Sequence, residues 1–220
     1  MIKNISNLGD AALYCDFGNN VNKETNTEVI KYYQSVKNIN INGINNLTPS
    51  YNKLIISFDL SITNFSKLKK IIENLSIDKK DNLSSKKIEI PICCDELFSL
   101  DIRRLESKLN LEREKIFDNF FKNEYFCYMT GFIAGMPFLG DLDKNMQVKR
   151  LETPRVKVPK GSVGLTEQFT NIYSFESPGG WNIIGNTPIN VFDNKNEAEP
   201  NLISPGDTIV FKRIDINQYN

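Results

Sequence analysis

The sequence predicts an α+β fold in which a small N-terminal α/β sandwich is followed by a β-barrel. In residues 1–84, short apolar runs alternate with segments of helical spacing, which is typical of a two-layer arrangement of strands and helices. After residue 124, many short apolar runs are separated by Gly and Pro turns, which is typical of a barrel. A chain of 220 residues has room for two domains. We therefore predict an N-terminal α+β domain at 1–84 and a barrel domain at 85–220.

The first domain is expected to contain two strands and two helices. The apolar runs at 11–17 and 53–58 predict strands, and residues 23–36 carry apolar side chains at helical spacing. The Asn- and Gly-rich stretch that follows, up to Pro49, is expected to be a loop. A second helix is expected to begin at 63–64, and its apolar face is formed by Leu68, Ile71, Ile72 and Leu75.

The polar segment 78–85 is expected to link the two domains. Beyond it, residues 87–93 predict a strand, and residues 100–109 and 113–121 predict two helices that are separated at Asn110. Seven further runs between turn residues predict the other strands of the barrel: 125–132, 156–158, 163–165, 171–175, 181–186, 189–192 and 208–212.

The composition excludes several classes of function. The 27 basic residues balance 27 acidic residues, so a large basic surface for nucleic acid is not expected. The chain has no histidine, which excludes Ser-His-Asp triads, imidazole bases and His-containing zinc sites. None of the four cysteines lies in a C-x-x-C pair, so no metal site is expected.

The chain is expected to be cytoplasmic. Residues 1–9 lack the apolar core of a signal peptide, and no run approaches the ~20 apolar residues of a membrane span. Few, irregularly spaced cysteines fit a reducing compartment. We therefore expect neither a membrane nor a nucleic acid among the partners.

The Gly-rich segment 131–140 is the first candidate for a functional element. It lacks the G-K-[ST] of a P-loop, so no ATP site of that kind is recognised. Glycine in such a segment allows positive φ angles or a close approach of the backbone. The segment is expected to form either a turn at a corner of the barrel or a loop that shapes a cleft.

Arg155 and Trp181 are candidate binding residues. Arg155 stands between a proline and a β run, where a guanidinium is suited to bidentate recognition of a carboxylate or phosphate; the alternative is a surface salt bridge. Trp181, the only tryptophan, forms either a pocket wall or part of the core. Four hydroxyl side chains lie in the same β region: Ser162, Thr170, Tyr173 and Thr187.

The order of motifs in the last 100 residues is specific. GFIAGMPFLG at 131–140 is followed by TPR at 153–155, VPKGSVG at 158–164, SPGGW at 177–181 and PGDTIVF at 205–211. This collinear set resembles the allophanate hydrolase subunit 1 family.

The resemblance implies a small N-terminal α+β domain and a cyclophilin-like β-barrel domain. It implies that the chain is the B subunit of a 5-oxoprolinase, a complex that opens 5-oxoproline to glutamate, with ATP as co-substrate bound by this chain or by a partner. The implied partners are a homologous C subunit, similar to allophanate hydrolase subunit 2, and an A subunit of the LamB/YcsF type. The alternative within the same family is a regulatory protein that binds and inhibits a histidine kinase.

The resemblance also implies a binding site. Six residues at matching motif positions are expected to line a cleft: Arg155, Ser162, Thr170, Tyr173, Trp181 and Thr187. Arg155 is expected to hold the carboxylate of 5-oxoproline, with Trp181 and Tyr173 as walls. The loop expected to shape the cleft contains Gly131, Phe132, Gly135 and Pro137.

The chain departs from the family pattern at Phe120. The family usually has a histidine at this place, five residues before the position of Tyr125. If that histidine is catalytic, this chain is altered or inactive; if it is structural, the aromatic ring of Phe120 fills its place. At the level of sequence both alternatives stay open.

Overall fold

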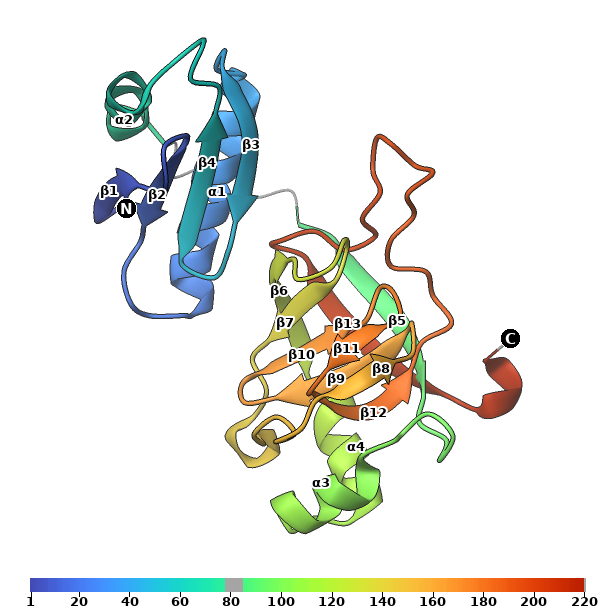
Figure 1. Ribbon diagram of the computed structural model, residues 1–220. Helices are drawn as coiled ribbons and strands as arrows, with labels where there is room; N and C mark the ends of the chain where they lie inside the picture. The colour runs from blue at the N-terminus through green and yellow to red at the C-terminus, as the bar shows by residue number, and fades with distance from the viewer. Residues whose placement is uncertain (78–84, 220) are drawn as a thin grey trace. The chain divides into compact units, whose positions relative to one another are not determined.

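The computed structural model describes residues 1–77 and 85–219. The chain divides into two compact units, Met1–Ser84 and Ser85–Asn220 (Figure 1). The segment predicted as a linker, 78–85, lies outside the described residues except for Ser85. That each unit is an independent domain stays a prediction.

The first unit is an antiparallel sheet with two helices, as the sequence predicts. Its strands follow the order β1-β2-β4-β3, and its helices are α1 (Lys23–Ile39) and α2 (Phe65–Glu73). The strand bounds are β1 (Asn4–Asn7), β2 (Ala12–Asp16), β3 (Ile44–Pro49) and β4 (Lys53–Phe58). Alternate residues of β4 are buried against both helices, which gives this unit its own apolar core.

Local sequence explains where the two helices begin and end. The side chains of Asn22 and Asn64 accept backbone N–H bonds from Thr25 and Lys67, which caps α1 and α2 at their N-termini. Helix α1 ends at Asn40, which adopts the left-handed conformation that asparagine tolerates.

Three expectations for the first unit need correction. Strands β1 and β3 were not predicted, and β3 lies in the stretch expected to be a loop. Both are edge strands with mostly exposed or half-buried polar side chains, so they lack the apolar alternation that identifies a strand. Ile71, expected on the buried face of α2, is exposed, whereas Leu68 and Ile72 are buried.

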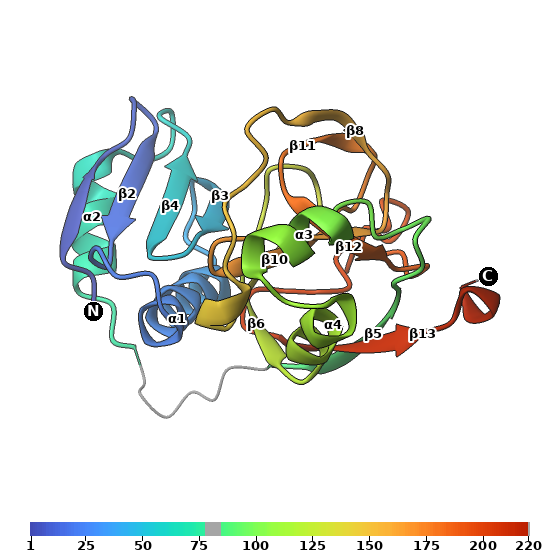
Figure 2. The same ribbon diagram turned by 90° about the horizontal axis from the view of Figure 1, so that it is seen from below.

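The second unit is a closed seven-stranded barrel with the strand order β10-β7-β6-β13-β5-β12-β9. The barrel strands are β5 (Lys87–Cys93), β6 (Glu124–Thr130), β7 (Pro137–Gly140), β9 (Ser162–Thr166), β10 (Phe169–Ile172), β12 (Asn182–Asn186) and β13 (Thr208–Ile214). Two helices, α3 (Ile102–Leu109) and α4 (Arg113–Phe121), lie at one end of the barrel (Figures 1 and 2). Short 3₁₀ helices are found at η1 (Lys144–Met146) and η2 (Ile216–Gln218).

The barrel core confirms the predicted fold class, and the barrel fits the cyclophilin-like description. Inward-facing residues such as Ile92, Leu165 and Phe211 pack with Leu105 and Phe117 of the two helices. Among residues 1–77 and 85–219, no helix is both long and apolar enough to cross a membrane.

The second unit differs from the expectations at three places. Strand β7 lies inside the Gly-rich segment, and β10 begins two residues before the expected run 171–175. Residues 189–192 form no strand: Val191 is buried, but only an isolated bridge joins Phe192 to Asn201. An apolar run therefore marks burial here without a strand ladder.

A short two-stranded sheet lies outside the barrel. It is formed by β8 (Arg155–Val158) and β11 (Ser177–Gly179), and Figure 2 shows it apart from the barrel strands. Val158 of this sheet packs with Tyr173 and Ile183 in a small apolar cluster separate from the barrel core. The β8–β11 sheet therefore covers the outer face of the barrel near β9, β10 and β12.

Candidate functional site

Three of the predicted site residues come together on this outer face: Arg155, Tyr173 and Trp181. Arg155 is the backbone partner of Gly179 across the β8–β11 sheet. Tyr173 extends from the end of β10 to Gly179, where its hydroxyl occupies the place that a β-carbon would take. Trp181 follows two residues later, just before β12. We call Arg155, Tyr173, Trp181 and Gly179 the outer-face cluster.

Arg155 is held by an internal carboxylate. Its Nη2 donates to Oδ1 of Asp101 at 2.6 Å, and the Arg155 side chain remains 28% exposed. Its Nη1 is buried and has no hydrogen-bond partner among the residues that the structure describes. A buried guanidinium nitrogen without a partner is costly, so Nη1 has an unused capacity to donate a hydrogen bond.

Tyr173 is a neutral hydrogen-bonding group. Burial raises the pKa of its hydroxyl, and bonds with Asn171 and with the backbone of Trp181 oppose this rise, as do the charges of Arg150 and Arg155. The raised pKa keeps the phenol protonated near neutral pH. The protonated phenol of Tyr173 therefore keeps an O–H donor beside two guanidinium groups.

Trp181 is a buried aromatic residue packed on the outer face of the barrel. It is 9% exposed, and its ring meets that of Phe138 edge-on at 5.6 Å between centroids. A β-carbon at Gly164 would lie 2.9 Å from the β-carbon of Trp181, so the glycine lets the tryptophan lie close to β9. The indole is thereby fixed against this face.

The other predicted hydroxyls lie apart from this cluster. Thr170 is fully buried and donates to the carbonyl oxygen of Gly164 at 2.9 Å. Ser162 accepts from the Asn186 amide at 3.4 Å, and Thr187 Oγ1 accepts from the Ile189 N–H at 3.2 Å. These three hydroxyls make bonds within the barrel unit.

The Gly-rich segment forms a turn that leads into β7. The Gly131 N–H donates to the Met136 carbonyl at 3.0 Å, Phe132 is 69% exposed, and Pro137 begins the strand. Gly135 has φ +69°, and the ring of Phe192 lies where a β-carbon would be. Met136 and Phe138 pack against Tyr173 and Ile183, so the segment contributes to the apolar side of the outer face.

Sequence reasoning missed several residues beside the cluster. Asp101 binds Arg155 across 54 residues of sequence, and Arg150 lies against Gly180, with its Nε 3.4 Å from the position of a β-carbon there. Asn171 accepts the Gly164 N–H at 3.1 Å. Strand alternation places Asn171 on the outer face with Tyr173, and this signal was available in the sequence, since both lie in the predicted strand 171–175.

Phe120 lies in the barrel core, away from the outer-face cluster. It is completely buried, and its ring stacks on Phe211 with centroids 5.1 Å apart. The hydroxyl of Tyr125 donates to the Phe120 carbonyl at 2.8 Å. A side chain at this position contacts other core residues and is closed to solvent.

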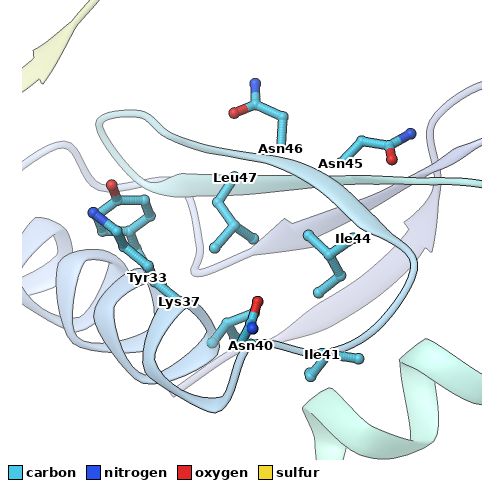
Figure 3. A pocket seen from close by; sticks show the side chains of 9 residues that line it. Tyr33, Lys37, Asn40, Ile41, Ile44, Asn45, Asn46 and Leu47 are labelled. Carbon is cyan, nitrogen blue, oxygen red and sulfur yellow. The ribbon is translucent and has the colours of Figure 1, made fainter. Parts of the chain in front are cut away.

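A pocket of about 240 Å³ lies in the first unit, between α1 and β3. Figure 3 shows Ile44 and Leu47 pointing toward α1, while Asn46 points away. Asn40 and Lys37 supply polar groups at its rim, and none of the predicted site residues lines it. Its lining contains no carboxylate or thiol, so this pocket is less suited to chemistry than the outer-face cluster.

The polar groups beside the outer-face cluster are guanidinium, phenol, amide and one carboxylate. In the parts of the chain that the structure describes, no group of three or more His, Cys, Asp or Glu side chains is placed to hold a metal ion. The guanidinium, phenol and amide groups beside the cluster are suited to holding a small anion by charge and hydrogen bonds.

The contact between Gly179 and Tyr173 leads to a first prediction. Gly179→Ala is expected to lower the free energy of unfolding by about 1–3 kcal/mol, because the new methyl group displaces the buried Tyr173 hydroxyl. Gly180→Ala is the matched control, since its β-carbon meets its nearest neighbour at 3.4 Å, and we expect a change within about 0.5 kcal/mol. Urea unfolding of both variants measures the difference, and equal stabilities would contradict this geometry.

Comparisons with known proteins add a further finding. A family model described as "Carboxyltransferase domain, subdomain C and D" matches residues 3–203. The B subunit of the 5-oxoprolinase of Bacillus subtilis is 30% identical over 228 residues, which covers 98% of this chain and 95% of that protein. The protein of the same name from Haemophilus influenzae is 37% identical over 170 residues, covering 77% of this chain and 76% of that protein.

A solved structure is similar over almost the whole chain. TTHA0988 superposes with a TM-score of 0.84 and 27% sequence identity over 94% of this chain. The present chain spans only 40% of the length of that longer chain. The same fold thus occurs as one segment of a larger polypeptide.

Proposed function

The chain belongs to the family of the carboxyltransferase domain, subdomain C and D, and from this membership we propose that it is the B subunit of an ATP-dependent 5-oxoprolinase. The match confirms the resemblance that the motif order indicates. The single observation that carries the proposal is the correspondence with the B subunit of the Bacillus subtilis 5-oxoprolinase over 98% of this chain and 95% of that protein.

The proposed reaction is the opening of the ring amide of 5-oxoproline to glutamate, with ATP as co-substrate of the complex. The proposed partners are a homologous C subunit, similar to allophanate hydrolase subunit 2, and a LamB/YcsF-type A subunit. The similarity to 40% of the longer TTHA0988 chain supports a fold that acts beside other protein segments. A cytoplasmic location stays a prediction.

Arg155 is proposed to bind the carboxylate of 5-oxoproline. One edge of its guanidinium is taken by Asp101 at 2.6 Å, while Nη1 is left without a hydrogen-bond partner among the described residues. A carboxylate oxygen at Nη1 would form a charge-assisted bond, which is stronger than a bond between neutral groups. The charge of the guanidinium therefore favours the carboxylate over the neutral ring amide as the group that Arg155 holds.

Trp181 and Tyr173 are proposed to contact the ring of the substrate. The flat indole, set edge-on to Phe138, offers apolar area, and the protonated Tyr173 offers a donor to the ring carbonyl. In this arrangement the outer-face cluster binds and orients one end of the substrate. The chemistry at the amide then depends on groups of the assembled complex.

Ser162, Thr170 and Thr187 stay predictions as lining residues, as does the cleft-shaping loop. The bonds of these hydroxyls within the barrel fit a supporting role for the strands that carry Tyr173 and Trp181. The burial of Phe120 supports a structural role at this position, so we propose that turnover does not pass through it. The names of the relatives do not favour the histidine-kinase inhibitor as an alternative.

The proposal is tested by reconstitution. The chain is mixed with its cognate A and C subunits, ATP and 5-oxoproline, and glutamate is measured with each component omitted in turn. We expect glutamate only in the complete mixture. Glutamate formation that does not depend on this chain would contradict the proposal, as would a stable complex with the C subunit that forms no glutamate.

A further inference from the structure

Asp101 is a buried carboxylate that does not cap the helix at whose N-terminus it lies. It occupies the N-cap position of α3, where an aspartate side chain normally accepts backbone N–H bonds from its own helix. Here the side chain makes no such cap bond, although the residue is only 5% exposed. Both of its oxygens are instead directed to the outer face of the barrel.

The two oxygens of Asp101 bind two different elements. Oδ1 accepts from Arg155 Nη2 at 2.6 Å, and Oδ2 accepts from the Ile183 N–H at 2.7 Å. The Asp101 N–H also donates to the Ile183 carbonyl at 3.0 Å, so the backbone of Ile183 is held from both sides. Asp101 thereby connects the start of β8 to β12 through one side chain.

Ile183, which Asp101 binds, lies two residues after Trp181 in the chain. Strand β12 has an irregular register with β9 between Ile183 and Gly185, and it pairs with β5 through Asn186 and Cys93. A strand with an interrupted ladder is held less firmly by its neighbours. The two bonds from Asp101 restrain the backbone of Ile183, close in sequence to Trp181.

We propose that Asp101 is a positioning residue for the binding of a small monocarboxylate, an inference that rests on the proposed function. It holds Arg155 by one edge of the guanidinium, so that the other edge is directed to the ligand carboxylate, and it fixes the backbone beside Trp181. Arg150 and Arg155 bring two positive groups to the outer-face cluster and Asp101 brings one negative group. Together these three side chains favour a ligand with a single negative charge.

The test uses the assembled complex and the variant Asp101→Asn, which keeps the size of the side chain and removes its charge. We expect the KM for 5-oxoproline to rise about tenfold with kcat within about twofold, because Arg155 loses a charge-assisted partner. In an Arg155→Lys background, the same change is expected to raise the KM by a clearly smaller factor than in the wild type, since the part of the effect that acts through Arg155 is already lost and only the part that acts through Ile183 remains.

The fluorescence of Trp181 tests the positioning role of Asp101 without a measurement of turnover. Trp181 is the only tryptophan, so the intrinsic tryptophan emission of the chain comes from the outer-face cluster. Asp101→Asn is expected to shift this emission to longer wavelength in the ligand-free chain. The matched control is Asp207→Asn, which also removes a buried charge in the barrel unit, where Asp207 accepts the N–H groups of Lys86 and Ser204.

Three results would overturn the proposal: an unchanged KM and emission in Asp101→Asn, an equal rise of KM in both backgrounds, or the same changes in Asp207→Asn. If the wild-type complex does not turn over 5-oxoproline, the proposed function fails by that result alone. The emission of Trp181 then decides the role of Asp101, and an unshifted spectrum overturns it.

Discussion

Arg155→Lys is expected to raise the KM of the assembled complex for 5-oxoproline by about 10- to 100-fold, because a charge-assisted bond contributes about 1.5–3 kcal/mol. Lysine keeps the positive charge but has no planar fork. An ammonium is a compact point charge without two donor edges at fixed positions, so it does not hold Asp101 and a carboxylate in the geometry that Arg155 has in the proposed complex. Steady-state kinetics over a range of 5-oxoproline concentrations measures the change.

The matched control is Arg213→Lys. Arg213 forms a two-pronged pair with Glu114 on the exposed surface of the same unit, so the variant makes the same chemical change outside the outer-face cluster. We expect its KM to stay within about twofold of the wild type, since exposed ion pairs contribute little. An Arg155→Lys complex with unchanged kinetics would refute carboxylate binding by Arg155.

Phe120→Ala is expected to lower the free energy of unfolding by about 3–5 kcal/mol. The ring of Phe120 is fully buried and stacks on Phe211, so its removal leaves a cavity in the barrel core. Phe121→Ala, one residue later, removes the same atoms from a partly buried site, and we expect a loss of about 1 kcal/mol. Urea unfolding measured by circular dichroism compares the two variants.

The functional part of this prediction uses a milder change. Phe120→Leu keeps an apolar side chain in the core, and the folded complex is expected to retain the kcat and KM of the wild type. Loss of turnover in a stably folded Phe120→Leu complex would contradict the structural role of this position. Near-equal stabilities of Phe120→Ala and Phe121→Ala would contradict its place in the core.

The sequence correctly predicted the elements in which burial of one face sets the spacing of the apolar residues. Strands β4 and β5 and helix α4 have the expected bounds, because one face of each is packed and therefore apolar. Strands β1 and β3 were missed because an edge strand has one neighbour and tolerates polar side chains. Residues 189–192 show the opposite error, since Val191 is buried by packing without a ladder.

The candidate site could be predicted only in part, for a related reason. Arg155, Tyr173 and Trp181 stand in motifs that the sequence displays, and the structure brings them together. The partner of Arg155 lies 54 residues away on another element, and no local pattern connects Asp101 to it. Pairing between distant residues depends on how the barrel closes, which a single sequence does not reveal.

The most direct test of the account is a structure of the assembled complex with 5-oxoproline bound. The account predicts the substrate on the outer face of the barrel, with its carboxylate within hydrogen-bond distance of Arg155 Nη1 and its ring between Trp181 and Tyr173. A substrate held entirely by another protein of the complex, with the outer-face cluster unchanged and without contact to it, would contradict the account.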